Sequence, residues 1–96
     1  MSVKMDFFKL VEQEREILRK FGVKRLGLFG SCAIEADAAE SDIDVLVEFD
    51  NKTFDNFMGL KFFLEERLNR NIDLVTVDEL KPALKEEILR EVKYAA

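Results

Sequence analysis

Two aspartates stand two residues apart at the start of the most apolar stretch of the chain. Asp42 and Asp44 flank Ile43, and residues 43–49 (IDVLVEF) form a predicted strand. In a strand, residues i and i+2 face the same side, roughly 6.6–6.8 Å apart along the chain. Two carboxylates so placed repel each other unless a cation lies between them, and a pair of divalent ions there would suit a phosphoryl displacement. The alternative is a solvated strand start, in which Asp42 only caps a turn.

A Gly-Ser pair precedes the aspartates, and ten residues separate Ser31 from Asp42. Gly30 ends a predicted strand over residues 24–29, and Ser31 opens a short predicted helix. Glycine lets the backbone approach a ligand closely, and the N–H groups at a helix start bind phosphate. An ordinary strand-to-helix turn is the alternative. Together, a phosphate cradle and a pair of metal-binding carboxylates predict one site for a nucleoside triphosphate.

A third carboxylate, Asp73, lies at the start of another predicted strand over residues 72–77 (IDLVTV). Between Ile72 and Leu74, a charged side chain is costly if it is buried without a partner. If this strand lies beside the one that begins near Asp42, Asp73 can join the metal site or act as the general base on the attacking hydroxyl. A strand-start aspartate in solvent is the alternative.

Composition narrows the chemistry to carboxylates. The 96 residues include no His and a single cysteine, Cys32, which excludes an imidazole base, a disulfide within the chain and a Cys-based metal site. Carboxylates prefer hard cations such as Mg²⁺. The net charge of −5 argues against binding of long nucleic acid by this chain alone. No apolar run reaches the roughly 20 residues that span a membrane, and the charged start is unlike a signal peptide, so we expect no membrane partner and a cytoplasmic protein.

The remaining elements follow from hydrophobic periodicity and turn residues. The order α-β-α-β-α-β-α predicts a single α/β domain over residues 1–96, with a small sheet of three or four strands. The apolar strand 43–49 is typical of a strand covered on both faces. The predicted elements are a helix over 5–21 that Gly22 ends, a strand over 24–29, a short helix over 31–36, a loop over 37–41, a strand over 43–49, a helix over 54–69 with Thr53 as its cap, a strand over 72–77, and a helix over 78–94 with Pro82 in its first turn.

The stretch GSCAIEADAAESDID, followed later by DLV, resembles the minimal nucleotidyltransferase domains of the polymerase-beta-like superfamily. Their signature is Gly-Ser, ten residues, Asp-x-Asp, and a third aspartate on a later strand. The flanking LFGS, SDIDVLVEF and closing LKPALKEEILREV are also similar to the family. The resemblance implies the nucleotidyltransferase fold, an α/β fold with a small mixed sheet. It implies that Gly30 and Ser31 hold the triphosphate, that Asp42, Asp44 and Asp73 complete a site for two Mg²⁺ ions, and that Asp73 helps to activate the acceptor.

The implied reaction transfers a nucleoside monophosphate, most often AMP from ATP, and releases pyrophosphate. Domains of this size are similar to antitoxins whose toxin is a HEPN-domain ribonuclease, and the antitoxin adds AMP to a toxin tyrosine. This chain departs from the family in the linking loop, which has Cys32, Ile34 and Glu35 in place of basic and glycine residues and also carries Asp37 and Glu40. Acids near a triphosphate weaken its binding.

Two other functions therefore stay open. The first is an antitoxin that binds and occludes its partner without catalysis. The second is a catalytic subunit that depends on a separate helical substrate-binding protein. A homodimer and a hetero-oligomer are both compatible with the sequence.

Overall fold

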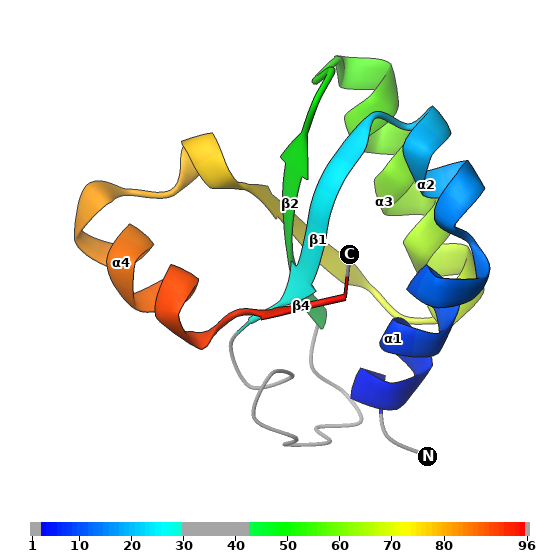
Figure 1. The fold of residues 1–96 in the computed structure, drawn as a ribbon, viewed down its shortest axis with the longest axis horizontal. Helices are drawn as coiled ribbons and strands as arrows, with labels where there is room; N and C mark the ends of the chain where they lie inside the picture. The colour runs from blue at the N-terminus through cyan, green and yellow to red at the C-terminus, as the bar shows by residue number, and fades with distance from the viewer. Residues whose placement is uncertain (1–2, 30–42, 96) are drawn as a thin grey trace.

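The computed structural model describes residues 3–29 and 43–95 of the chain, and these form helices around one sheet (Figure 1). The predicted short helix over 31–36 and the predicted loop over 37–41 lie outside the described residues. The elements are α1 (Val3–Gln13), α2 (Arg15–Lys20), β1 (Val23–Leu28), β2 (Ile43–Phe49), α3 (Phe54–Leu68), β3 (Ile72–Thr76), the 3₁₀ turn η2 (Val77–Glu79), α4 (Pro82–Glu91) and β4 (Lys93–Tyr94).

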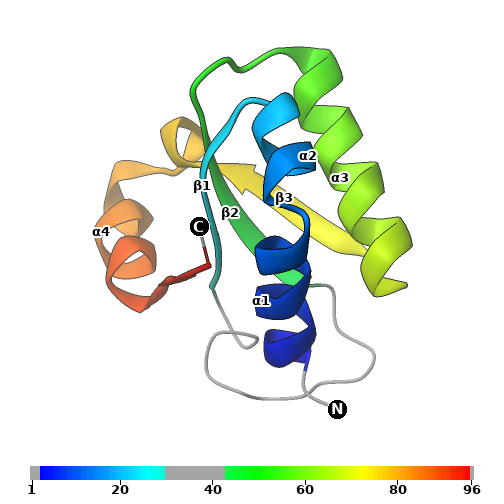
Figure 2. The same ribbon diagram turned by 45° about the vertical axis from the view of Figure 1, so that its right-hand side comes forward.

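The sheet has four strands in the order β3-β2-β1-β4 and is mixed. β2 and β3 run parallel, joined by the crossover helix α3, whereas β1 is antiparallel to both β2 and β4. Helices α1, α2 and α3 lie on one side of the sheet and α4 lies on the other (Figure 2). The α/β class and the small mixed sheet predicted from the sequence are confirmed.

The core lies between the sheet and the three helices α1–α3. Its strand residues alternate, because every second side chain of a strand faces the same side. β2 is buried on both faces at its centre, where Val45, Leu46 and Val47 are fully buried, as the apolar run of the sequence predicts. The buried core residues are Phe7, Leu10, Val11, Leu18, Leu26, Leu28, Ile43, Val45, Val47, Leu60, Leu64, Ile72 and Leu74.

The helix predicted over 5–21 is two helices, which corrects the sequence-based boundary. The backbone of Glu14, with φ −114° and ψ 30°, separates α1 from α2. Its carboxylate forms an ion pair with Arg67 of α3 at 3.4 Å. Because hydrophobic periodicity continues across a single non-helical residue, the sequence could not indicate this break. Gly22, at φ 76°, does follow the helical stretch as predicted, in the left-handed conformation that glycine tolerates.

The amino-terminal end of α3 lies where the sequence predicted it, with Thr53 as its cap. The Asn56 N–H donates to Thr53 Oγ1 at 3.0 Å, which is the N-cap bond that satisfies a free donor of the first turn. The helix ends at Leu68, one residue before the predicted end, because Asn69 adopts a left-handed conformation with φ 54°.

The helix predicted over 78–94 is wrong at both ends. Pro82 is the first residue of α4, and Lys81 before it is extended, with ψ 139°. A proline disfavours helical backbone at the preceding residue and lacks the N–H that a helix interior uses. The chain therefore forms a separate turn, η2, before α4. After Glu91 it becomes extended again and adds β4 to the edge of β1.

No helix within the described parts of the chain is long and apolar enough to cross a membrane.

Candidate active site

Asp44 and Asp73 are register partners on the neighbouring parallel strands β2 and β3. Each is the second residue of its strand. Adjacent strands lie about 4.8 Å apart, so the two residues are neighbours across the ladder. The condition that the sequence left open for Asp73 is therefore met at Asp44, because the two strands lie side by side.

Both aspartates belong to the face of the sheet opposite the helical core. Ile43 and Val45 flank Asp44 and are buried in the core, as Ile72 and Leu74 are on either side of Asp73. Side chains alternate along a strand, so the two aspartates must project to the other side. Asp44 is half-buried, and Asp73 is exposed to solvent.

Backbone hydrogen bonds hold this end of the sheet together. Phe29 N–H donates to the Asp44 carbonyl at 3.1 Å, and Ile43 N–H donates to the Asn71 carbonyl at 3.0 Å. The end of β1 and the starts of β2 and β3 therefore meet where the two aspartates stand. Gly30 directly follows Phe29 in the sequence, but Gly30, Ser31 and Asp42 all lie outside the described residues.

The paired carboxylates fit a hard divalent cation. Carboxylate oxygens are the ligands that Mg²⁺ prefers, and a cation between two such groups removes their mutual repulsion. Among residues 3–29 and 43–95, no group of three or more His, Cys, Asp or Glu side chains gathers closely enough to hold a metal. The roles of Asp42, Asp44 and Asp73 as metal ligands therefore stay predictions.

The sequence-based reasoning missed the support that the carboxyl-terminal segment gives to β1. A Cβ atom on Gly27 would lie 2.8 Å from the Lys93 carbonyl oxygen and 2.8 Å from Val92 Cγ2. Only a glycine allows this close approach, and Ala95 N–H then donates to the Leu26 carbonyl at 2.8 Å. Gly27 inside a predicted strand was the available hint, because such a glycine often marks the close approach of another backbone, but it does not say which segment approaches.

A charged cluster lies at the opposite end of β2 and β3. Lys52 Nζ donates to Thr76 Oγ1 at 3.3 Å, to Asp78 Oδ2 at 3.4 Å and to Glu79 Oε1 at 3.1 Å. The hydrogen bond that Lys52 donates to Glu79, followed by the one that it donates to Asp78, raises the pKa of Lys52. A backbone hydrogen bond within Asp78 itself, followed by its bond to Lys52, lowers the pKa of that carboxyl. The cluster ties the turn before α3 to η2.

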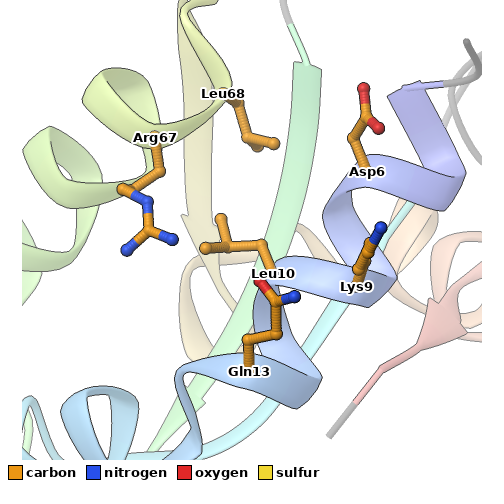
Figure 3. A pocket seen from close by; sticks show the side chains of 6 residues that line it. All are labelled: Asp6, Lys9, Leu10, Gln13, Arg67 and Leu68. Carbon is orange, nitrogen blue, oxygen red and sulfur yellow. The ribbon is translucent and has the colours of Figure 1, made fainter.

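A small hollow lies between α1 and the end of α3, and its volume is about 210 Å³ (Figure 3). Cationic, anionic and apolar side chains share its walls, so its charge favours no one kind of ligand. α1 and α3 cover the core face of the sheet, whereas Asp44 and Asp73 project from the other face. The lining residues are Asp6, Lys9, Leu10, Gln13, Arg67 and Leu68.

Comparison with known families and proteins gives a consistent result. The family described as "Nucleotidyltransferase domain" matches residues 10–95. A candidate protein adenylyltransferase of Methanocaldococcus jannaschii is 45% identical over 76 residues, which cover 78% of this chain and 82% of that protein. The protein adenylyltransferase MntA of Thermococcus cleftensis is 35% identical over 86 residues, covering 88% and 87% of the two chains.

Solved structures share the fold. The structure of a candidate minimal nucleotidyltransferase superposes with a TM-score of 0.74 at 32% identity, covering 90% of this chain and 93% of the other. A chain in the complex of a tri-AMPylated Shewanella oneidensis HEPN toxin with an MNT antitoxin gives a TM-score of 0.63 at 22% identity, covering 93% and 71%. At that lower identity the likeness concerns the fold alone.

Proposed function

Because this chain belongs to the nucleotidyltransferase domain family, a family of enzymes, we propose that it is a Mg²⁺-dependent protein adenylyltransferase. In this reaction a hydroxyl oxygen of a protein acceptor bonds to the α-phosphorus of ATP, the bond from that phosphorus to the bridging oxygen breaks, and pyrophosphate leaves with the electron pair. The observation that carries the proposal is the register pairing of Asp44 with Asp73 at one end of the parallel ladder.

Each predicted site residue has a role in this proposal. Asp42 and Asp44 hold the divalent ions, which supply positive charge against the phosphate oxygens. Asp73 completes the ligand set and accepts the proton of the attacking hydroxyl. Gly30 and Ser31 contact the triphosphate with backbone N–H groups and a hydroxyl. Asp73 is exposed, so an acceptor hydroxyl can reach it from solvent.

We also propose that the acceptor is a HEPN-domain toxin, which makes the chain an antitoxin. Two observations support this proposal: the relation to an adenylyltransferase named MntA, and the shared fold with an MNT antitoxin in complex with an AMPylated HEPN toxin. Occlusion without catalysis is the second candidate. It is favoured by Glu35, Asp37 and Glu40, because negative charges between the Gly-Ser pair and the aspartates disfavour a triphosphate.

One experiment separates the two functions. The purified protein is incubated with ATP, Mg²⁺ and a HEPN-domain protein, and the intact mass of that protein is measured. We expect additions of AMP mass that disappear in the Asp42→Asn/Asp44→Asn variant and persist in Glu66→Gln, whose carboxylate is exposed on α3. An unshifted mass together with a tight complex that the double variant also forms would favour occlusion. A catalytic subunit that needs another protein would be inactive until a helical substrate-binding protein is added.

A further inference from the structure

The peptide unit between Asn71 and Ile72 is held from both sides at the start of β3. Its carbonyl oxygen, on Asn71, accepts from the Ile43 N–H of β2 at 3.0 Å. Its N–H, on Ile72, donates to Glu65 Oε2 of α3 at 3.2 Å. The C=O and N–H of a trans peptide point in opposite directions, so one bond is made toward the neighbouring strand and the other toward the edge of the sheet.

The second bond is needed because β3 is the last strand on its side of the sheet. In the order β3-β2-β1-β4, β3 has β2 as its one neighbour among the described strands. The outward N–H groups of such an edge strand have no further strand to pair with. Ile72 is buried, and a buried N–H without a partner is costly. The Glu65 carboxylate thus replaces a missing strand at this one position.

The position of Glu65 is unfavourable for a carboxylate in other respects. It lies in the last turn of α3, where the negative end of the helix dipole disfavours an anion. Arg67, two residues further on, pairs with Glu14 instead. Within residues 3–29 and 43–95, the bond to Ile72 is the only polar interaction of this carboxylate. Glu65 is half-buried, whereas its neighbour Glu66 is exposed.

We propose that Glu65 is a positioning residue for Asp73. The clamped peptide unit directly precedes the point where Asp73 meets Asp44 across the parallel ladder (Figure 2). The inference rests on the proposed function for the role of Asp73, and it adds what holds that residue in place. Without the clamp the first residues of β3 can shift, and a small displacement of a catalytic group lowers the rate strongly.

Two substitutions of Glu65 and two control variants test this role. Glu65→Ala removes the acceptor but preserves α3, because alanine favours helix and the lost charge is unfavourable at this end. Glu65→Gln keeps a side-chain oxygen that accepts from an N–H. Glu66→Ala is the matched control on the next residue. Thr53→Ala removes the cap at the other end of α3 and so controls for a loss of stability alone. Circular dichroism verifies that all four are folded.

Amide hydrogen exchange measures the clamp in the protein without metal or nucleotide. We expect the Ile43 and Ile72 amides to exchange about tenfold faster in Glu65→Ala, because local opening exposes both. In Glu65→Gln both rates should lie within about twofold of the wild type, since the amide oxygen still accepts the bond. Glu66→Ala should leave both rates unchanged. The Ala95 amide, which is bonded at the other edge of the sheet, is the reference.

The AMP-transfer assay measures the effect of the clamp on the reaction. With a HEPN-domain acceptor, Glu65→Ala should lower kcat about tenfold and leave KM for the acceptor unchanged, because residues that support a site typically contribute about 10–100-fold. Glu65→Gln should restore kcat to within about twofold of the wild type. Glu66→Ala and Thr53→Ala should have the kcat of the wild type.

Any of three results would overturn the proposal. The first is equal exchange of the Ile43 and Ile72 amides in the wild type and in Glu65→Ala. The second is a Glu65→Gln variant that recovers neither the exchange rates nor kcat. The third is an equal loss of kcat in Glu65→Ala and Thr53→Ala, which would reduce the bond to a contribution to stability.

The two assays also keep this inference separate from the proposed function. If the wild-type protein transfers no AMP, the proposed reaction fails, and the exchange rates still decide whether Glu65 holds the start of β3. If AMP is transferred and Glu65→Ala keeps the kcat of the wild type, the positioning role fails and the reaction stands.

Discussion

Asp44 on β2 and Asp73 on β3 face each other across a parallel ladder, and both project from the face of the sheet that the core helices leave uncovered. The backbone bonds Phe29 to Asp44 and Ile43 to Asn71 fix this arrangement from both neighbouring strands. Carboxylates on neighbouring strands repel each other, and the proposed Mg²⁺ ions would offset that repulsion.

Removal of the Asp73 carboxylate should abolish most AMP transfer without unfolding the chain. Asp73→Asn keeps the size of the side chain at an exposed position but removes its charge and its ability to accept the proton. We expect the rate of AMP transfer to fall at least about 100-fold, measured by mass spectrometry of the acceptor over time. Glu66→Gln serves as the control. Wild-type activity of the Asp73→Asn variant would show that Asp73 is not part of the active site.

Divalent metal should stabilise the protein only when nucleotide is present. A triphosphate supplies the oxygen ligands that the carboxylates alone do not, so Mg²⁺ or Mn²⁺ and ATP bind together. At 100 times the dissociation constant, the free energy of unfolding rises by about 2.7 kcal/mol, which thermal unfolding detects readily. Asp44→Asn should lose this shift. If neither ion changes the melting temperature of the wild-type protein with ATP, the paired carboxylates bind no metal.

Substitution of Gly27 by alanine should loosen the carboxyl-terminal strand. The added Cβ would clash with the backbone of Lys93, which cannot move without breaking the pairing of β4 with β1. We expect a loss of about 1–3 kcal/mol in the free energy of unfolding, measured by urea denaturation. Hydrogen exchange of the Ala95 amide, which bonds to Leu26, should speed up, and that of the Ile43 amide should serve as the unaffected reference. Equal protection of Ala95 in both proteins would contradict this account.

The ion pair between Lys52 and Asp78 should make a pH-dependent contribution to stability. The folded-state pKa of Asp78 is below its ordinary value of 3.8, so its contribution is present above pH 3.8 and is lost as the pH falls through the lowered pKa. The pKa of Lys52 is raised above 10.5, so its contribution is present below pH 10.5 and is lost as the pH rises through the raised value. Both side chains are exposed, so the effect is small.

Urea denaturation of wild type and Asp78→Asn checks this pH dependence. The difference in free energy of unfolding should be constant between pH 5 and 9 and should shrink below pH 3.8. A double-mutant cycle with Lys52→Met should show that the two substitutions are not additive at pH 7. If the difference in free energy of unfolding between the two proteins grows as the pH falls, the pKa of Asp78 is not lowered in the folded state.

Local patterns determined much of the fold. The apolar run of residues 43–49 is a strand with those bounds, Thr53 caps the following helix, and Gly22 follows the helical segment before β1. Each of these features depends on the side chains and backbone preferences of residues that are close together in the chain. Such local preferences can be inferred from the sequence alone. The identities and spacing of the aspartates also come from the sequence, as does the restriction to carboxylate chemistry in a chain without histidine.

Contacts between distant segments were decided only by the tertiary structure. The sequence places Asp73 at a strand start but not opposite Asp44, because the register depends on how the crossover helix α3 packs against the face of the sheet. β4 is too short to be recognised and exists only because β1 offers it a free edge and a glycine at Gly27. Such features need hydrogen bonds and packing between segments far apart in the chain, which no local pattern encodes.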